Sequence, residues 1–369
     1  MDKKRKINIF ITGGHLTPAI AIYSKIKNIE DINIYFIGIK HTILFDKSLS
    51  KEYEFAKKNN IRFLPVKTGK IYRFLSLKGI LSIFLIPLGF LQSLYYYLLY
   101  RPKIIISFGS YVAVPITIIG NIFNSKVFTH IQAIVPGLSD RIIARFAKYI
   151  FISWKQTEEY INTKGNIIYT GNIVRKEIFE IHTNSFKFKN KLPIIYITGG
   201  NQGSHRINTI IFTNLSSLLE KYNIVHQTGS NTIYNDFEKA KNYQKQNLKK
   251  PGTYIPITGI WGKEIGEILN KSELIIGRAG ANSIYEILIL SKKAILIPLP
   301  ESAYNEQLKN AQVAQNESRN IEILEEKNID NNLLLKTIDS MIKQKNKKNK
   351  IMLEENAEYT IVKYILKSY

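Results

Sequence analysis

The feature that most constrains this chain is a repeated order of short β-branched runs, each followed by a turn and a helical stretch. In the first half these runs are Ile7–Thr12, Ile32–Ile39, Ile61–Val66, Ile104–Phe108, Lys126–His130 and Tyr149–Ser153. A second series comprises Pro193–Thr198, Ile224–Gln227, Leu274–Ile276 and Ala294–Ile297. Strands that alternate with helices form a parallel sheet covered by helices. Two such series predict two Rossmann-like, doubly wound α/β domains facing a cleft, with ligands at the carboxyl ends of their strands.

The expected boundary between the domains falls in the polar and charged stretch Gly171–Lys191. We expect an N-terminal domain of residues 1–172 and a C-terminal domain of residues 173–350, since 369 residues suffice for two domains. A Lys- and Asn-rich linker, Lys343–Lys350, precedes a final helix, residues 351–369. We expect this helix to pack back on the N-terminal domain.

The net charge and the absence of cysteine limit the classes of function that this chain can have. Lys and Arg number 52 against 29 Asp and Glu, so the net charge is +23, which favours an anionic partner such as a nucleic acid, a membrane surface or a phosphorylated substrate. The absence of cysteine excludes a disulfide scaffold, a Cys-ligated zinc site and a thiol nucleophile. The first apolar run, Ile7–Ile11, is shorter than the 7–15 residues or so of a secretory signal, so we expect a protein of the cytoplasmic side.

An uncharged stretch of 22 residues, Gly79–Tyr100, has the length of a membrane span. Pro87 and Gly89 interrupt it. A span would also separate Ile61–Val66 from Ile104–Phe108, although both runs are expected to be strands of one sheet. We therefore expect a crossover helix that is buried or touches a membrane.

The charge distribution around this stretch favours contact with a membrane. The 85 residues Phe55–Ser139 contain no acidic residue. They contain ten basic ones: Lys57, Lys58, Arg62, Lys67, Lys70, Arg73, Lys78, Arg101, Lys103 and Lys126. Basic residues beside apolar ones suit an anionic leaflet, at about 1 kcal/mol per Lys or Arg. We expect a peripheral protein on the cytoplasmic face of the cell membrane; the alternative is a solvated basic face on a Lys-rich protein.

A glycine pair follows the first predicted strand, in the order Thr12-Gly13-Gly14-His15. Glycines let the backbone approach a ligand closely, and the next helix presents free N–H groups that favour anions. The spacing is neither that of a dinucleotide fingerprint nor that of a Walker loop. An imidazole at this position can act as a general base near neutral pH, which makes His15 a candidate catalytic residue. The alternative is a histidine that caps the turn.

The loop Gly199–Ser204 follows the first strand of the second series and mirrors the first motif. Its consecutive N–H groups at a helix start, with no acid nearby, are typical of a phosphate-binding loop. Arg175, near the domain boundary, can clamp a phosphate or a carboxylate; its alternative is a surface salt bridge.

The most specific motif, Gly277–Glu286, also joins a strand to a helix. The carboxylate of Glu286 near a helix start can accept hydrogen bonds from a ribose diol. Further along, Gln307 offers an amide to sugar hydroxyls, or is a helix-surface Gln.

Together these motifs resemble the MurG family of glycosyltransferases, in order and spacing, from about residue 7 to residue 315. Gly-Gly-x-Gln-Gly at 199–203 and Arg-x-Gly-Ala-x-x-x-x-Glu at 278–286 carry most of the resemblance. It implies a GT-B fold and an inverting hexosyltransferase of peptidoglycan synthesis, with no obligatory protein-bound metal and no other cofactor. The implied reaction moves GlcNAc from UDP-GlcNAc to undecaprenyl-diphosphate-linked muramyl-pentapeptide, which converts lipid I to lipid II.

The resemblance also implies roles for single residues. His15 would be the catalytic base. Glu286 would hold the ribose, and Gln307 the GlcNAc hydroxyls. The implied substrate-binding residues are Thr12, Gly13, Gly14, Arg175, Gly200, Asn201, Gln202, Gly203, Gly280, Ala281, Asn282, Glu286 and Gln307.

Four positions depart from the family's pattern. Ala133 replaces a polar or acidic residue, and Ile131 a Glu; Asn201 replaces Ser, and Glu306 stands where Gln or His is common. The changes at Ala133 and Ile131 motivate an alternative, a UDP-sugar transferase with a different membrane lipid acceptor. A non-enzyme that binds sugar nucleotides or nucleic acid is a third hypothesis, motivated by the charge. No nucleic-acid motif is present, and we expect no nucleic-acid partner.

Overall fold

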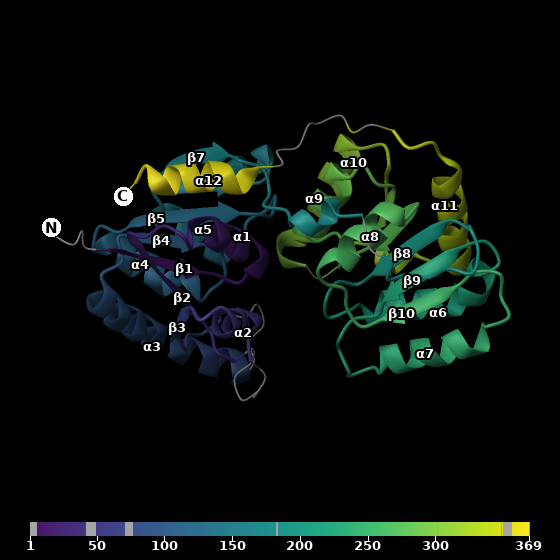
Figure 1. Ribbon diagram of the computed structural model, residues 1–369, viewed down its shortest axis with the longest axis horizontal. Coiled ribbons are helices and arrows are strands. Elements are labelled where there is room, and N and C mark those ends of the chain that lie inside the picture. The colour runs from purple at the N-terminus through teal and green to yellow at the C-terminus, as the bar shows by residue number, and fades with distance from the viewer. Residues whose placement is uncertain are drawn as a thin grey trace. The chain divides into compact units, whose positions relative to one another are not determined.

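The computed structural model describes residues 6–41, 49–70, 77–181, 184–300, 302–347, 349 and 356–368. The chain divides into two compact units (Figure 1). Unit 1 comprises Met1–Ile173 and Glu354–Tyr369, and unit 2 comprises Val174–Leu353. Each unit contains one parallel sheet with helices on both faces, which confirms the predicted class of two Rossmann-like α/β domains.

Unit 1 is built on a seven-stranded sheet of order β3-β2-β1-β4-β5-β6-β7, in which all pairings are parallel. The strands are β1 (Ile7–Thr12), β2 (Ile32–Gly38), β3 (Arg62–Pro65), β4 (Ile104–Ser107), β5 (Lys126–Ile131), β6 (Tyr149–Ile152) and β7 (Asn166–Tyr169). The helices are α1 (Leu16–Ile26), α2 (Lys51–Lys58), α3 (Leu77–Tyr100), α4 (Ala113–Ile122), α5 (Leu138–Phe146), the 3₁₀ helix η1 (Lys155–Tyr160) and α12 (Ala357–Leu366).

Alternate strand residues of unit 1 enter separate cores on the two sheet faces. Ile9 and Ile11 belong to the core under α1 and α12, whereas Phe10 between them belongs to the core under α3, α4 and α5. Both faces are covered, so both sets of alternate positions are apolar. The near-continuous Ile and Phe runs of the sequence follow from this burial.

Unit 2 repeats the plan with a six-stranded sheet of order β10-β9-β8-β11-β12-β13. Its strands are β8 (Ile194–Thr198), β9 (Asn223–Gln227), β10 (Tyr254–Ile257), β11 (Leu274–Gly277), β12 (Ala294–Leu296) and β13 (Ile321–Ile323). Its helices are α6 (His205–Leu218), α7 (Asp236–Gln246), α8 (Lys263–Lys271), α9 (Ala281–Ile289), α10 (Glu306–Glu317) and α11 (Asn331–Lys343), with 3₁₀ helices η2 (Lys176–Phe179), η3 (Ala303–Asn305) and η4 (Glu326–Asn328). The apolar faces of α6, α7 and α11 pack on one side of this sheet.

All ten predicted strands are present, and each of their ends lies within one residue of the predicted end. The predictions omitted β7, β10 and β13, which lie at sheet edges. An edge strand is short and pairs on one side, so its sequence is less uniformly apolar: β10 contains Pro256 and β13 contains Glu322.

The last helix, α12, belongs to unit 1. Its Ile361 and Ile365 lie in the core beside α1, and the ring of Tyr364 contacts those of Tyr149 and Phe151. The helix begins at Ala357, later than the expected residue 351. Residues 348, 350, 351–355 and 369 of the expected linker and helix lie outside the described residues, as does Arg73 of the basic stretch.

The apolar stretch forms α3, a crossover between β3 and β4 of one sheet. By length and hydropathy Ser82–Tyr100 qualifies as a membrane span (mean hydropathy 1.5), and 22% of that window is buried. Its exposed side chains form a stripe that continues onto the end of α4. The stripe comprises Ile83, Phe84, Leu88, Leu91, Tyr95, Leu98, Leu99, Ile122 and Phe123. We refer to these residues as the apolar face of unit 1.

Candidate active site

The topology of unit 2 predicts where its ligand binds. β8 pairs with β9 on one side and with β11 on the other, so the direction of chain progression reverses between β8 and β11. In open α/β sheets ligands bind at such a point, beyond the carboxyl ends of the strands. Thr198 and Gly277 end these two strands side by side. The loops that follow lead into α6 and α9, so both helix N-termini lie at this edge.

Two glycines of the loop after β8 serve different purposes. Gly203 has a φ of +83°, and a Cβ there would collide with the carbonyl oxygen of Thr228. Gly200 has a φ of +86°, but a Cβ there would meet no atom of the described residues within 4 Å. Gly203 is therefore required by packing, whereas Gly200 borders open space that a ligand can enter.

A cavity of about 470 Å³ opens between the two loops. Gly200, Gly203 and Gly280 line it with backbone, and Ser283 and Gln307 with side chains. Its basic lining residues are His205, Arg206 and Arg278, and no described acidic residue lines it. We call it the donor cavity, after the sugar-nucleotide donor that the resemblance leads us to expect; its glycine backbone and basic residues suit an anionic ligand.

Arg278 ties the two loops together, and the sequence predictions had not included it among the site residues. Its Nη2 donates to Ser204 Oγ at 2.6 Å, and its Nη1 donates to the carbonyl of Ile297 at 3.1 Å. Nη1 also lies 2.5 Å from a carboxylate oxygen of Glu326. These contacts hold the guanidinium in place, so Arg278 fixes the shape of the cavity. Its position in the motif Gly-Arg-x-Gly-Ala was the available signal.

Arg175 and Glu286, predicted separately as nucleotide contacts, form a bidentate ion pair. Nε and Nη2 of Arg175 donate to the two carboxylate oxygens at 2.7 and 2.9 Å. The Glu286 side chain is 8% exposed and that of Arg175 34% exposed. Both line a smaller cavity of about 80 Å³, which shares Gly200 and Ser283 with the donor cavity. Each carboxylate oxygen retains a lone pair, so Glu286 can still accept from a hydroxyl.

The other predicted donor-site residues differ in placement. Gln307 lines the donor cavity, and its Oε1 accepts from the N–H of Leu299 at 3.0 Å, which leaves Nε2 as a donor for a ligand. Asn201 lines the smaller cavity. Gln202 belongs to the loop after β8, and Ala281 and Asn282 begin α9, but none of the three is among the described residues that line either cavity.

In unit 1 the equivalent strands are β1 and β4, whose ends Thr12 and Ser107 pair. Gly13 has a φ of +133°, and a Cβ there would lie 2.7 Å from the backbone of Phe108, so the loop after β1 packs tightly on the next loop. A Cβ added at Gly14 would lie 2.9 Å from the Cβ of Ser110. Thr12 is 3% exposed. Predicted residues Thr12 to His15 therefore form one rigid turn at the carboxyl edge of the sheet.

His15 occupies the position before α1, but its side chain makes no capping hydrogen bond to the helix within the described residues. The alternative interpretation, that the His15 side chain caps the turn, is therefore not observed. Part of the residue is exposed to solvent, and desolvation by the surrounding protein lowers the pKa of the imidazole from its usual 6.5. A neutral imidazole at pH 7 can accept a proton.

A second histidine, His130, is the last residue but one of β5 and is 2% exposed. Its Nε2 lies 3.2 Å from the carbonyl of Gly171 and 3.3 Å from Ser153 Oγ. Burial lowers the pKa of His130 to about 4, so the ring is neutral near pH 7. His130 lies inside the protein and is a structural residue of this sheet.

Comparison with known proteins agrees with this geometry. Residues 12–152 match the glycosyltransferase family 28 N-terminal domain and residues 194–365 the family 28 C-terminal domain. A relative from Borreliella burgdorferi, UDP-N-acetylglucosamine--N-acetylmuramyl-(pentapeptide) pyrophosphoryl-undecaprenol N-acetylglucosamine transferase, is 33% identical over 94% of this chain and 89% of its own length. The transferase of the same name from Clostridium tetani is 28% identical over 91% of this chain and 89% of its own.

Solved structures share the fold. The crystal structure of Acinetobacter baumannii MurG aligns with a TM-score of 0.69 at 19% identity, over 98% of this chain and 99% of that one. UDP-GlcNAc 2-epimerase from Neisseria meningitidis aligns with a TM-score of 0.61 at 12% identity, over 98% and 99%. These identities support the fold and no more.

The two family 28 domains, each with a glycine loop at its switch point, define a glycosyltransferase of the hexosyltransferase class. Within that class the chain belongs to the MurG family. The resemblance predicted from the motifs is confirmed.

The ion pair of Arg175 and Glu286 leads to a stability prediction. Arg175→Ala leaves a carboxylate that is 8% exposed without its partner. We expect a loss of about 2 kcal/mol in the free energy of unfolding, less than the 3–5 kcal/mol of a fully buried pair because Arg175 is partly solvated. Urea unfolding of the variant and the wild type measures this loss. In the double variant Arg175→Ala/Glu286→Gln most of the loss should be recovered; additive losses would contradict the pairing.

Proposed function

We propose that this protein transfers GlcNAc from UDP-GlcNAc to undecaprenyl-diphosphate-linked muramyl-pentapeptide, converting lipid I to lipid II in peptidoglycan synthesis. The observation that carries the proposal is the donor cavity, where two glycine loops and three basic residues meet at the switch point of unit 2. Relatives that match nearly the whole chain bear the name of this transferase. The reaction is inverting, with direct attack by the acceptor hydroxyl.

Unit 2 binds the donor. The N–H groups at the starts of α6 and α9 hold the diphosphate, because helix N-termini stabilise negative charge. Glu286, fixed by Arg175, accepts hydrogen bonds from the ribose, and Gln307 donates to the sugar hydroxyls. The negative charge on UDP grows as it leaves, and oriented N–H groups stabilise it without reorganisation.

Unit 1 provides the base and the acceptor site. His15 takes the proton from the acceptor hydroxyl while the oxygen forms a bond to the anomeric carbon. The bond from that carbon to the phosphate oxygen breaks, and its electron pair leaves with UDP. The lowered pKa of His15 keeps the ring unprotonated and ready to accept at neutral pH.

A second candidate function has the same donor but a different membrane lipid acceptor. Ile131, where the family has a Glu, is 1% exposed and lies in the core under α4 and α5, so it cannot contact a ligand. Ala133 offers its backbone carbonyl to Thr157 and has no polar side-chain atom. A panel of muramyl-peptide and other polyprenyl-diphosphate acceptors separates the two functions.

The direct test is transfer of labelled GlcNAc from UDP-GlcNAc to a lipid I analogue with a short, soluble lipid chain. We expect transfer by the wild type, and in Glu286→Ala a KM for UDP-GlcNAc about 10-fold or more higher, because a ribose contact to a charged group is lost. Binding of UDP-GlcNAc without transfer to this acceptor would favour the second function. No binding of UDP-GlcNAc would overturn both.

The assignment of His15 as the base predicts a specific kinetic defect. His15→Ala should lower kcat at least about 100-fold with little change in the KM for UDP-GlcNAc, since general-base catalysis contributes about 10²–10⁴-fold. In the wild type kcat/KM should be level at neutral and alkaline pH and fall at acidic pH as the ring is protonated, because the pKa of His15 is lowered. Turnover near the wild-type value in His15→Ala would contradict the role.

We also propose that the apolar face of unit 1 docks on the cytoplasmic leaflet of the cell membrane. Phe84, Leu91 and Tyr95 on α3 are 74%, 65% and 62% exposed, spaced along one side of the helix. Contiguous exposed apolar patches mark interaction surfaces. The basic residues Arg101 and Lys103, which follow α3 and are exposed, add attraction to anionic lipids.

Charged substitutions on α3 test this docking. Phe84→Asp/Leu91→Asp should weaken binding to vesicles with anionic lipid about 10-fold or more, because each buried aromatic or leucine contributes about 1.5–3 kcal/mol. Co-sedimentation measures it. Leu248→Asp, which alters an equally exposed apolar residue of unit 2, serves as the control. Transfer to the soluble-chain acceptor should remain unchanged in all variants; equal vesicle binding by the α3 variant would exclude this face.

A further inference from the structure

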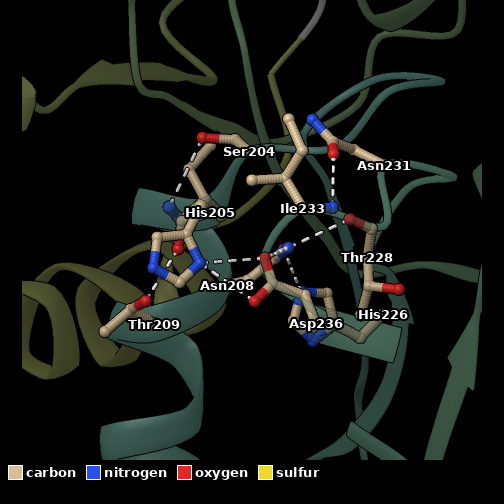
Figure 2. Close-up of polar contacts among 10 residues, drawn as sticks. Ser204, His205, Asn208, Thr209, His226, Thr228, Asn231, Ile233 and Asp236 are labelled. Carbon is tan, nitrogen blue, oxygen red and sulfur yellow. Dashed lines mark hydrogen bonds and ion pairs between the residues drawn. The ribbon is translucent and has the colours of Figure 1, made fainter. Parts of the chain in front are cut away.

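One titratable residue of the donor cavity has no role in the functions assigned above. His205 is the first residue of α6 and lines the cavity, with 39% of its side chain exposed. Its Nδ1 lies 2.9 and 3.1 Å from the two carboxylate oxygens of Asp236 at the start of α7 (Figure 2). The Asp236 side chain is 7% exposed. A buried carboxylate therefore holds one edge of a ring at the cavity.

The carboxylate is itself fixed by a buried polar network. Asn208 Nδ2 donates to Asp236 Oδ2 at 2.8 Å and to the carbonyl of Thr228 at 3.0 Å, so its Oδ1 is the atom 3.0 Å from His226 Nε2 (Figure 2). Burial lowers the pKa of His226 to about 3, so that ring is neutral. His226 Nε2 then donates to Asn208, and its Nδ1 accepts from the hydroxyl of Tyr254 at 2.9 Å.

The network sets the direction of the hydrogen bond at His205. Asp236 only accepts, so Nδ1 of His205 carries a proton and Nε2 is the edge left for another partner. Within the described part of the chain Nε2 has no hydrogen-bond partner. The ring of Tyr234 stacks on the imidazole, with centroids 3.8 Å apart and planes at 8°. Asp236 and Tyr234 together hold the ring in one orientation.

The other basic groups of the cavity differ from His205. Arg278 already contacts Ser204, two backbone carbonyls and Glu326. Arg206 is an exposed side chain on α6 for which the described residues show no partner. His205 is thus the basic group of the cavity that is both oriented by its surroundings and open at its Nε2 edge.

We propose that His205, oriented by Asp236, is a diphosphate-binding residue of the donor site. As an imidazolium it donates Nε2–H to a phosphate oxygen of UDP-GlcNAc and stabilises the charge of UDP as it leaves, while Asp236 balances the positive charge from the opposite edge. Asp236 is a positioning residue because it acts through His205. The proposal rests on the proposed function and adds a side-chain contact to the diphosphate beside the glycine-loop N–H groups.

The test is calorimetric titration of the full chain with uridine, UMP and UDP. In His205→Ala we expect UDP to bind about 10-fold or more weakly, since a charge-assisted hydrogen bond is lost, and uridine to bind within twofold of the wild type. His205→Lys, which restores a cation, should recover part of the UDP affinity. Asp236→Asn should show an intermediate loss. Thr213→Val, on an exposed turn of the same helix, is the matched control and should bind as the wild type does.

The outcomes separate the proposed role of His205 from the proposed transferase function. UDP affinity in His205→Ala within twofold of the wild type would overturn the role of His205 but not the transferase function. An equal loss for uridine, UMP and UDP would show a structural role and would also overturn it. A loss that includes UMP supports contact with the α-phosphate, and a loss confined to UDP supports the β-phosphate. Failure of the wild type to bind UDP would instead contradict the proposed function.

Discussion

Parallel pairing of β8 with β11, and of β1 with β4, is the constraint on which the rest of this structure depends. Parallel strands are joined by helical crossovers. Each strand is therefore followed by a loop and the N-terminus of a helix, and all of these lie at the same edge of the sheet. At the switch point the two loops diverge and leave room for a ligand. The glycine loops, the helix N-termini and the donor cavity are consequences of that pairing.

Most of this arrangement was predictable from the sequence, because local signals specify it. Isoleucine-rich runs indicate strands whose two faces are both covered by helices. Glycines indicate the ligand loops: Gly200 borders open space, and Gly203 has no room for a Cβ. Of the four edge strands, β3 was predicted and β7, β10 and β13 were not, because pairing on one side relaxes the demand for apolar residues.

Side-chain pairs in the site could not be predicted in the same way. Arg175 and Glu286 are 111 positions apart, and His205 and Asp236 are 31 apart. Neither contact can therefore be predicted from the spacing of residues in the sequence. The motifs located Arg175 and Glu286 as separate candidates, and only the fold shows that one holds the other. Arg278 was visible in its motif, but its bonds to Ser204 and Glu326 depend on tertiary structure.

The two ion pairs of the donor region obey a common rule. A carboxylate with little solvent contact is costly unless it is paired and hydrogen-bonded, and Glu286 and Asp236 each meet that condition through a basic partner that is partly exposed. Each pair therefore has a buried carboxylate anchored in unit 2 and a basic partner near a cavity. Such an arrangement fixes the basic groups before a ligand binds, so little conformational entropy is lost at that moment. Preorganised charge of this kind is what departure of an anionic nucleotide requires.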